Sequence, residues 1–368
     1  MATTVVGKGD SIAVKLYSVS LFKYSLGESF WLSKMAGKDF VKKDRPGKIL
    51  GTSPEYPLQI IRDLTTSAGD RVSVDVFTDI RGDGVYGDDI LEGKEKDLTW
   101  YTDEVFIEQI RQAVSAGGRM SRKRTKHDLR MVARDMLKRW FARYFDESIT
   151  VYLCGRRGKN TSQWVLDTAW SGFAGNSLQP ADAEHSFALD ATGNYTPNPA
   201  NATTFSLKWL DKLDTYISKM DVPPNPIVIN GEEYYVVVLN PDAVEQLRTD
   251  TSVGSWLDIQ KNAGVRGAEN PIFKNSLGSY GRFILYSYSK LPIFTAGTQQ
   301  VANNLVLGAQ AAIVAFGNAG GNFNLRWEEE VRDYGNLLSV SAGIIWGVKK
   351  TRFNGKDFGV LSLYSKVA

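Results

Sequence analysis

The chain has 368 residues, 43% of them apolar and 23% charged, fractions that are typical of globular proteins. Its 44 basic and 41 acidic side chains give a formal charge of +3, which is too balanced for a dedicated nucleic-acid binder. The single cysteine, Cys154, excludes an intrachain disulfide and a multi-thiolate metal site, and we expect it to be buried. Without a run of eighteen apolar residues or a signal-peptide core, the sequence indicates a cytoplasmic product.

Signatures of enzyme chemistry are scarce. The two histidines, His127 and His185, lie far apart and belong to no metal-binding spacing. The sequence contains no G-x-S-x-G elbow, no Walker loop and no G-x-G-x-x-G fingerprint. We therefore expect a protein that is not an enzyme and that needs no metal and no cofactor. A carbohydrate-active enzyme or adhesin stays an alternative, because glycosidases need only two carboxylates that a sequence cannot pair.

The first third of the chain predicts an extended arm followed by a long hairpin. Residues 1–50 carry only short apolar runs, which favours an arm over a packed domain. In residues 71–80, RVSVDVFTDI, apolar and polar side chains alternate with the period of a half-buried strand. We expect a return strand at 98–105, and the glycine-rich acidic stretch between the two strands predicts the tip of the hairpin.

The clearest local pattern predicts a long amphipathic helix at about residues 126–145. Apolar residues recur there at helical spacing, while most of the basic residues fall outside that stripe. Thr125 and Asp128 resemble a capping box with Asp in place of Glu, which places the helix start at about Lys126. The stripe consists of Leu129, Val132, Ala133, Met136, Leu137, Trp140 and Tyr144.

The rest of the chain mixes helices and strands without strict alternation, so α+β is the expected fold class. Residues 158–201 are rich in Ser, Asn, Gly and Thr and predict a long irregular excursion. We further expect helices at about 204–220, 242–248 and 304–315, and strands at 233–239, at 282–287 and in the tail segments SVSAGIIWGVKK and DFGVLSLYS.

In this order, the pieces resemble the major capsid proteins of N-four-like tailed bacteriophages, which have the Hong Kong 97-type capsid fold. The resemblance runs from about residue 50 to the end, and it rests on the joint order of several strings. They are GDDILEGKE (87–95), TKHDLRMVARDMLKRWFARYFD (125–146), VVVLNPDAVEQLRTD (236–250), RGAENPIF (266–273), LGAQA (307–311), WEEEVRDYGN and GVKKTRFNGKDFGV. An encapsulin-like compartment shell shares the fold and is a rival, which the phage-type strings disfavour.

The resemblance implies a division of the chain into five parts. They are an N-terminal arm (1–50), an E-loop hairpin (66–106), the first pass of a peripheral domain (107–222) with the spine helix, an axial domain (223–320) and a return to the peripheral domain (321–368). The implied function is that of a major capsid protein, which self-assembles into the icosahedral head shell around a double-stranded DNA genome.

Charged residues of the hairpin, the helix, the axial domain and the tail are the candidate contact residues. We expect the acidic hairpin tip to dock on a basic patch of an adjacent subunit, with a solvated surface as the alternative. The intersubunit candidates are Asp83, Asp88, Asp89, Glu92, Arg130, Arg134, Lys138, Arg266 and Glu269, and the DNA-facing candidates are Lys349, Lys350 and Lys356.

The resemblance also implies partners and a location. The main partners are other copies of the chain, which form the hexamers and pentamers of the shell. A portal protein, an optional decoration protein and packaged DNA, bound by nonspecific contact, are the others. No contact with a membrane is expected. Only about fifty to sixty residues precede the hairpin, so we expect the scaffolding protein to be encoded separately. The protein is expected to be made in the bacterial host cytoplasm and to reside in the virion capsid.

Overall fold

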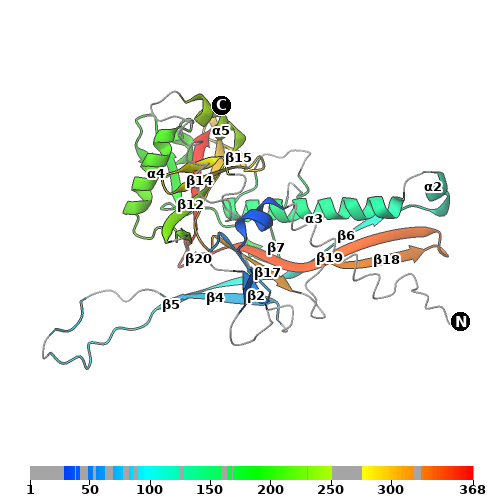
Figure 1. Cartoon of the computed structure of the whole chain (residues 1–368), viewed down its shortest axis with the longest axis horizontal. Helices are drawn as coiled ribbons and strands as arrows, with labels where there is room; N and C mark the ends of the chain where they lie inside the picture. Colours follow the sequence, from blue (N-terminus) through cyan, green and yellow to red (C-terminus); the bar gives the residue numbers. More distant parts are fainter. Residues whose placement is uncertain are drawn as a thin grey trace.

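The computed structural model places one long helix, α3 (Leu129–Cys154), between two β-sheets. It describes residues 29–37, 39–41, 49–52, 55–62, 69–77, 83–86, 89–124, 128–158, 164–167, 169–229, 231–250, 276–317 and 325–367. Figure 1 shows a compact lobe at the upper left, a long flat extension to the right and a hairpin that projects at the lower left. Three parts of the molecule thus leave its centre in different directions.

The compact lobe is built on a nine-stranded mixed sheet. Its elements are β9 (Ser186–Leu189), β10 (Tyr195–Thr196), β11 (Ile227–Ile229), β12 (Glu232–Leu239), β13 (Gly278–Tyr280), β14 (Phe283–Ser287), β15 (Ile293–Ala296), β16 (Gln299–Leu307) and β22 (Val360–Lys366), covered by α4 (Leu207–Lys219) and α5 (Pro241–Thr249). Along β12, Tyr235 and Val237 belong to the core beneath α4 and α5, whereas Val236 and Val238 belong to the core around α3. Both faces of this sheet are therefore covered, which explains the unbroken apolar run of β12.

The extension is a seven-stranded sheet with β19 (Leu337–Lys350) as its longest strand. The other strands are β1 (Asp39–Val41), β2 (Ile49–Thr52), β3 (Leu58–Ile61), β6 (Glu108–Ser115), β17 (Ala312–Gly317) and β18 (Arg326–Arg332). β19 pairs antiparallel with β17, β6 and β18. The short pair β20 (Arg352–Phe353) and β21 (Lys356–Asp357) then leads the chain into β22, so the tail joins the two sheets.

The ends of α3 are fixed by local chemistry. The Asp128 carboxylate caps the helix by accepting hydrogen bonds from the backbone N–H groups of Arg130 and Met131. Gly155 ends the helix with a φ of 64°, and a Cβ there would lie 2.0 Å from the carbonyl oxygen of Gln179. At 1.5 Å per residue the helix is about 39 Å long, which lets it reach from the lobe far into the extension.

Burial changes near the middle of α3. From Tyr144 to Cys154 every residue except Asp146 is buried. Phe145 belongs to the core around α3, and its ring centroid lies 4.8 Å from that of Trp346 in β19. In the first half of the helix, Met131 and Met136 are exposed.

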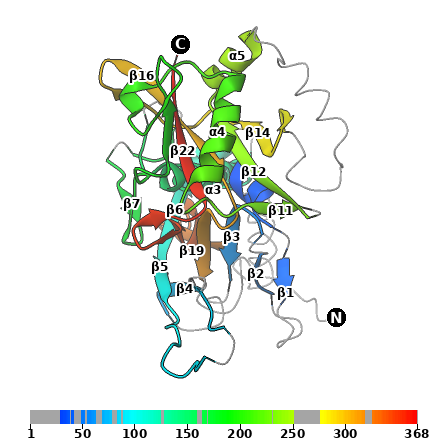
Figure 2. The same ribbon diagram turned by 90° about the vertical axis from the view of Figure 1, so that its left-hand side faces the viewer.

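The hairpin consists of β4 (Arg71–Phe77) and β5 (Trp100–Phe106), which pair antiparallel over their full lengths. Val72, Val74 and Val76 are half-buried while their neighbours are exposed, so the expected alternation is confirmed for residues 71–76. Residues 78–80 lie outside the described residues. Figure 2 shows the hairpin at the opposite end of the molecule from α5. A short helix, α2 (Arg119–Arg124), follows β6 at the far end of the extension.

The excursion expected at 158–201 is confirmed as largely irregular in its described parts. Beside β9 and β10, its described residues form only β7 (Gly172–Phe173), β8 (Asn176–Ser177) and one turn of 3-10 helix, η3 (Pro199–Asn201). It is tied to α3 by Tyr152, whose hydroxyl donates to the carbonyl of Asn176 (2.8 Å) and accepts from the N–H of Phe173 (2.7 Å). The loop is therefore part of the packed structure.

Two local predictions were wrong. The helix expected at 304–315 is instead the end of β16 and most of β17. Both segments are buried on both faces, so the sequence shows a continuous apolar run that periodicity cannot assign to helix or strand. The helix expected at about 126–145 was also wrong at its ends, because Asp128 caps it, so that it begins at Leu129, and it continues to Cys154.

The expected extended arm, residues 1–50, was wrong for the segment that precedes β1. Residues 31–35 form a single helical turn, η1 (Trp31–Met35), whose Trp31 and Met35 are fully buried. The indole N–H of Trp31 donates to Thr150 of α3 (2.7 Å), and Asp146 accepts from the hydroxyl of Ser29 (2.5 Å). This segment is anchored in the core, and residues 1–28 lie outside the described residues.

The sheets also divide the chain differently from the expected boundaries. Helix α4 was expected in the part 107–222 and strand β22 in the returning tail, yet both belong to the compact lobe. β22 pairs with β16 from Val301↔Lys366 to Leu307↔Val360. Such pairings join residues about sixty positions apart, and local patterns do not contain them.

Candidate assembly surfaces

The base of the hairpin is tied to the centre of the molecule. Asp103 of β5 is only 7% exposed, and its carboxylate accepts hydrogen bonds from the Lys349 ammonium and from the backbone N–H of Arg352. Beside it, the side-chain amide of Asn176 binds both the N–H (3.0 Å) and the carbonyl (2.8 Å) of Phe106. These contacts fix the point at which the hairpin leaves the molecule.

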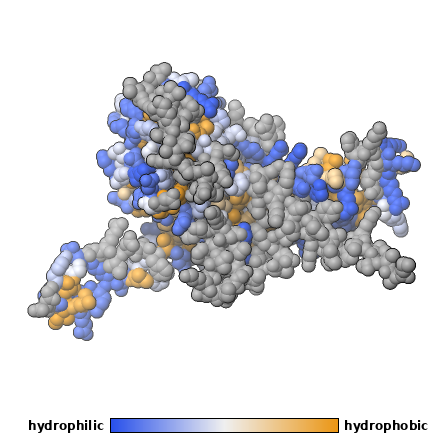
Figure 3. Space-filling model, in the orientation of Figure 1, coloured by the Kyte–Doolittle hydropathy of each residue, from blue (hydrophilic) through white to orange (hydrophobic). Residues whose placement is uncertain are grey.

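The far end of the hairpin is both acidic and apolar. Asp83, Asp89 and Glu92 are exposed, and the Asp89 carboxylate lies 3.5 Å from the Lys94 ammonium. Large exposed apolar side chains lie among them, and Figure 3 shows apolar surface at this end. They are Tyr86, Ile90, Leu91, Leu98 and Trp100. The sequence interpretation missed this surface, because these residues follow neither the helical nor the strand period.

The three basic residues expected to face a neighbouring subunit are paired within the chain. The Arg130 guanidinium lies 2.6 Å from Glu329 of β18. Arg134 and Lys138 both lie beside Asp135, at 3.3 and 3.6 Å. The helical spacing of the sequence indicates the basic side of α3, but only the structure shows that these charges already have partners within the chain.

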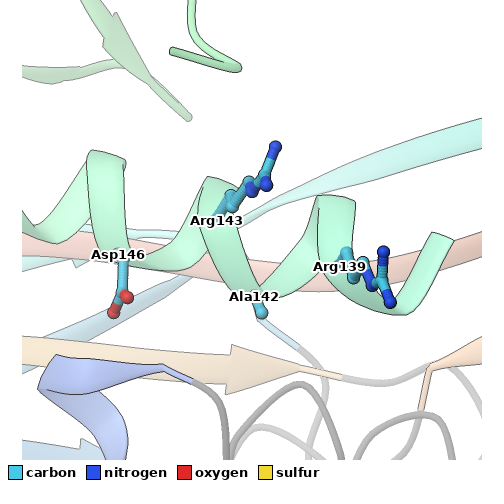
Figure 4. A pocket seen from close by; sticks show the side chains of 4 residues that line it. All are labelled: Arg139, Ala142, Arg143 and Asp146. Atoms are coloured by element: carbon cyan, nitrogen blue, oxygen red, sulfur yellow. The ribbon is translucent and has the colours of Figure 1, made fainter. Parts of the chain in front are cut away.

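Two other arginines of α3 offer a more open basic surface. Arg139 and Arg143 are exposed, and the described part of the chain holds no ion pair for either. With Ala142 and Asp146 they line a surface hollow of about 390 Å³, shown in Figure 4. Asp146 accepts hydrogen bonds from the backbone N–H groups of Phe30 and Trp31, which leaves the hollow predominantly basic. Both arginines lie outside the apolar stripe, so their position on the polar side of the helix could be read from the sequence, although they were not among the contact candidates.

Lys350 is buried, and its expected contact with DNA was wrong. Its side chain is 2% exposed, and its ammonium lies 2.7 Å from the carboxylate of Asp357. Burial lowers the pKa of Lys350 and raises that of Asp357, and their mutual attraction opposes both shifts. Arg352 lies 3.1 Å from the same carboxylate, so Lys350 belongs to an ionic cluster inside the molecule.

The other two tail lysines lie nearer the surface. The side chain of Lys349 is 21% exposed and binds Asp103 at the base of the hairpin. Lys356 is 41% exposed, lies 2.8 Å from Glu184, and this contact raises its pKa. Both lysines are paired inside the chain, which leaves less charge for an outside ligand than the sequence indicated.

The structure separates the predicted contact residues instead of gathering them into one site. The hairpin tip projects at one end of the long axis, and the first half of α3 lies towards the other end (Figure 1). Asp88, Arg266 and Glu269 lie outside the described residues. Within one chain the hairpin acids and the helix arginines are far apart, so a contact between them requires a second copy.

Among the described helices, none combines the length and the apolar character needed to cross a membrane. Over the same residues, no group of three or more His, Cys, Asp or Glu side chains is placed to hold a metal ion. Cys154 is buried and free, as expected, and burial raises the pKa of its thiol. Its surroundings are those of a packing residue.

Comparisons with known proteins agree with this arrangement. A family model described as phage capsid protein matches residues 5–368. The major capsid protein of Pseudomonas phage KPP25 is 28% identical over 343 residues, which cover 86% of this chain and 89% of the relative. The capsid of Ralstonia phage GP4 is 36% identical with a TM-score of 0.77, over 100% of this chain and 99% of that chain. The capsid asymmetric unit of cyanophage Pam1 is 20% identical with a TM-score of 0.66, over 92% and 99%.

Proposed function

The chain belongs to the phage capsid protein family and is the major capsid protein of a phage head, and from this we propose that its copies close into an icosahedral shell of hexamers and pentamers around double-stranded DNA. The fold is the expected Hong Kong 97-type capsid fold, of class α+β. The observation that carries the proposal is the family match over residues 5–368. It disfavours the enzyme, adhesin and compartment-shell alternatives, and no catalytic step is proposed.

The shape of the subunit supports a shell built from many modest contacts. The hairpin and the extension project from the centre, so each copy can reach its neighbours on more than one side. In this proposal residues 1–50 are the arm and residues 66–106 the E-loop. The peripheral domain is formed by 107–222 and 321–368, and the axial domain by 223–320. The sheets do not follow these boundaries throughout: α4, β9, β10 and β22 lie in the compact lobe, and β17 lies in the extension.

The hairpin tip is the proposed contact with an adjacent subunit. Its carboxylates would meet the basic side of α3 in the neighbour, where Arg139 and Arg143 are open and Arg130, Arg134 and Lys138 add positive potential. Its exposed apolar side chains would supply the buried centre of the contact, which charges at the rim cannot supply alone. Asp88, Arg266 and Glu269 stay candidates for intersubunit contacts by their residue types.

The remaining partners follow from the role of a head shell. Lys349 and Lys356 are partly exposed and stay candidates for nonspecific contact with packaged DNA. A scaffolding protein, a portal protein and an optional decoration protein complete the proposed partners. The protein would be made in the bacterial cytoplasm and would reside in the capsid of the virion.

Electron microscopy of the expressed chain tests the shell directly. The heaviest sedimenting fraction, prepared with and without a phage scaffolding protein, is expected to contain closed shells, tubes or sheets with hexameric units. A raised ratio of absorbance at 260 to 280 nm in native particles would indicate enclosed nucleic acid. Small particles alone, even with scaffolding protein present, would refute the proposal.

A charge exchange tests the proposed hairpin contact. Arg139→Glu with Arg143→Glu is expected to reduce shell yield, and adding Asp89→Lys with Glu92→Lys on the hairpin is expected to restore it. Lys212→Glu with Lys219→Glu makes the same charge change on exposed residues of α4 and is the matched control. Equal losses in both double variants, or no rescue, would contradict docking of the hairpin on α3.

A further inference from the structure

The short hairpin of β7 and β8, residues Gly172–Ser177, contacts both α3 and the base of the long hairpin and is here called the brace. Each of its strands has only two residues, so pairing within the brace cannot hold it alone. Ala174 and Gly175 form its turn with φ angles of 57° and 75°, as a tight two-residue turn requires. The stability of the brace must therefore come from the elements around it.

Aromatic and polar contacts attach the brace to the centre of the molecule. The ring of Phe173 stacks on Trp346 of β19, with centroids 5.9 Å apart, and meets Tyr144 of α3 edge to face. The hydroxyl of Tyr152, which is also in α3 and is only 1% exposed, binds backbone groups of Phe173 and Asn176. The position of the brace is thus set by α3 and β19.

Asn176 connects the brace to the long hairpin. Its side chain is buried, its amide oxygen accepts from the N–H of Phe106, and its amide nitrogen donates to the carbonyl of the same residue. In a sheet a neighbouring strand binds these two backbone groups, and a carboxamide can replace it because it offers both a donor and an acceptor. In addition, a Cβ at Gly347 of β19 would lie 2.0 Å from the Phe106 carbonyl oxygen. The backbone of β5 is therefore held closely by both the brace and β19.

Small rotations at Phe106 have large effects further along the hairpin. From Phe106 to Trp100 the strand β5 is about 20 Å long, at about 3.4 Å per residue. Further out, side-chain contacts join the two hairpin strands to each other, as between Thr102 and Asp75 (2.6 Å). A rotation of about 10° at Phe106 would therefore move Trp100 by about 3.5 Å. Such a displacement exceeds the tolerance of a hydrogen bond, so docking of the tip depends on the direction of the hairpin.

We infer that the brace fixes the direction of the long hairpin before assembly and that Asn176 is its positioning residue. This inference rests on the proposed docking of the hairpin tip on a neighbouring copy. A hairpin that already points in one direction loses less conformational freedom when it docks, so the contact is strengthened without any new interaction. The excursion at 158–201, to which the brace belongs, thereby has a role in assembly.

The distance between two spin labels measures the direction of the hairpin in the unassembled chain. Trp100→Cys at the end of β5 and Lys212→Cys on α4 place the labels at exposed positions, and the native Cys154 is buried. One narrow distribution of distances is expected for this labelled parent chain. Adding Asn176→Ala is expected to widen the distribution about twofold or more, because the backbone of β5 loses both bonds to the brace.

Two further variants keep this measurement decisive. Asn194→Ala changes an exposed asparagine of the same excursion, and as the matched control it is expected to leave the distribution unchanged. Tyr152→Phe keeps the buried ring but removes the hydroxyl that holds the brace, so it is expected to widen the distribution even if Asn176→Ala fails to fold. The Tm of each variant shows whether it is folded. A folded variant of Asn176 or Tyr152 with a distribution as narrow as that of the parent chain would overturn the inference.

Shell assembly measures whether the direction of the hairpin matters for docking. In the chain without labels, Asn176→Ala is expected to raise the protein concentration needed for shells about tenfold, whereas Asn194→Ala is expected to leave it unchanged. A wild-type concentration for Asn176→Ala would overturn the role in assembly. A wild-type chain that forms no shells would instead count against the shell function, and the spin-label distances of the unassembled chain would still test the brace.

Discussion

The two halves of α3 form one continuous helix but lie in different environments. The second half, residues 144–154, is buried in the core to which both sheets contribute, and its Phe145 packs against Trp346 of β19. The first half, residues 129–143, lies along the extension and exposes methionines and arginines. An amphipathic pattern requires one wet face, so the sequence showed it for the first half only. The comparison teaches that a single element can hold the core together at one end and present a surface at the other.

Shortening a side chain is expected to destabilise the protein much more in the second half of α3 than in the first. Phe145→Ala removes a fully buried ring between the sheets and is expected to lower the free energy of unfolding by about 3–5 kcal/mol. Met136→Ala removes a side chain that is 58% exposed and is expected to change it by less than about 0.5 kcal/mol. Urea unfolding of the unassembled chain measures both, and similar losses would show that the first half is also packed.

Loss of a charged side chain should likewise lower the free energy of unfolding more in the buried half of α3 than in the exposed half. Glu147 is fully buried and accepts hydrogen bonds from the N–H groups of Val165 (2.7 Å) and Leu166 (3.0 Å) and from Lys290 (2.7 Å). Glu147→Leu leaves these donors unpaired and is expected to cost about 3 kcal/mol. Arg134→Ala breaks a surface ion pair and is expected to cost less than about 1 kcal/mol. A large loss of stability in the arginine variant would contradict this distinction.

The N-terminal cap of α3 tests whether the exposed half of the helix can loosen without the buried half. Asp128→Ala removes the acceptor for the Arg130 and Met131 N–H groups and is expected to lower the free energy of unfolding by about 1 kcal/mol. Asp128→Asn keeps a capping oxygen and serves as the control. Hydrogen exchange is expected to speed up in the first turns of α3 and to stay unchanged in residues 144–154. Faster exchange throughout the helix would show that its halves unfold together.

The smallest expected effect is an opposite response of two carboxylates to pH. Burial by itself raises the pKa of Asp182, but hydrogen bonds from His185 and from the N–H of Asp357 hold it well below its usual range. Its contribution to stability is therefore complete above about pH 4 and is lost as the pH falls towards the folded value. Burial raises the pKa of Asp146 despite its hydrogen bond from Ser29. The folded chain then binds that proton first, so acidification towards pH 4 favours folding.

Two variants measure these slopes. The stability of the wild type relative to Asp182→Asn is expected to be constant from about pH 7 to 4 and to shrink below about pH 4. Relative to Asp146→Asn, the wild type is expected to gain stability as the pH falls from about 7 to 4. Chemical unfolding at several pH values decides both. Slopes of equal sign would mean that the two carboxyl groups do not differ as their surroundings indicate.

Sequence reasoning succeeded where a local pattern has one structural solution. β4 shows alternation and α4 shows helical spacing, and these two elements, together with β5 and α5, were predicted close to their observed ends. It failed at 304–315, where burial on both faces removes the alternation, and at η1, where a short apolar turn gave no period. Among the contact candidates, sequence reasoning identified the acidic hairpin and the basic helix, because the charge of a residue and its position in the chain can be read directly from the sequence.

The amino-acid sequence by itself therefore determined the fold class, the hairpin, the long helix and the resemblance to capsid proteins. The tertiary structure alone decided which charges are available. It buries Lys350 against Asp357, pairs Arg130 with Glu329, and leaves Arg139 and Tyr334 exposed. The physical reason is that burial and ion pairing depend on residues brought together from distant parts of the chain, whereas local patterns report only on neighbours in sequence.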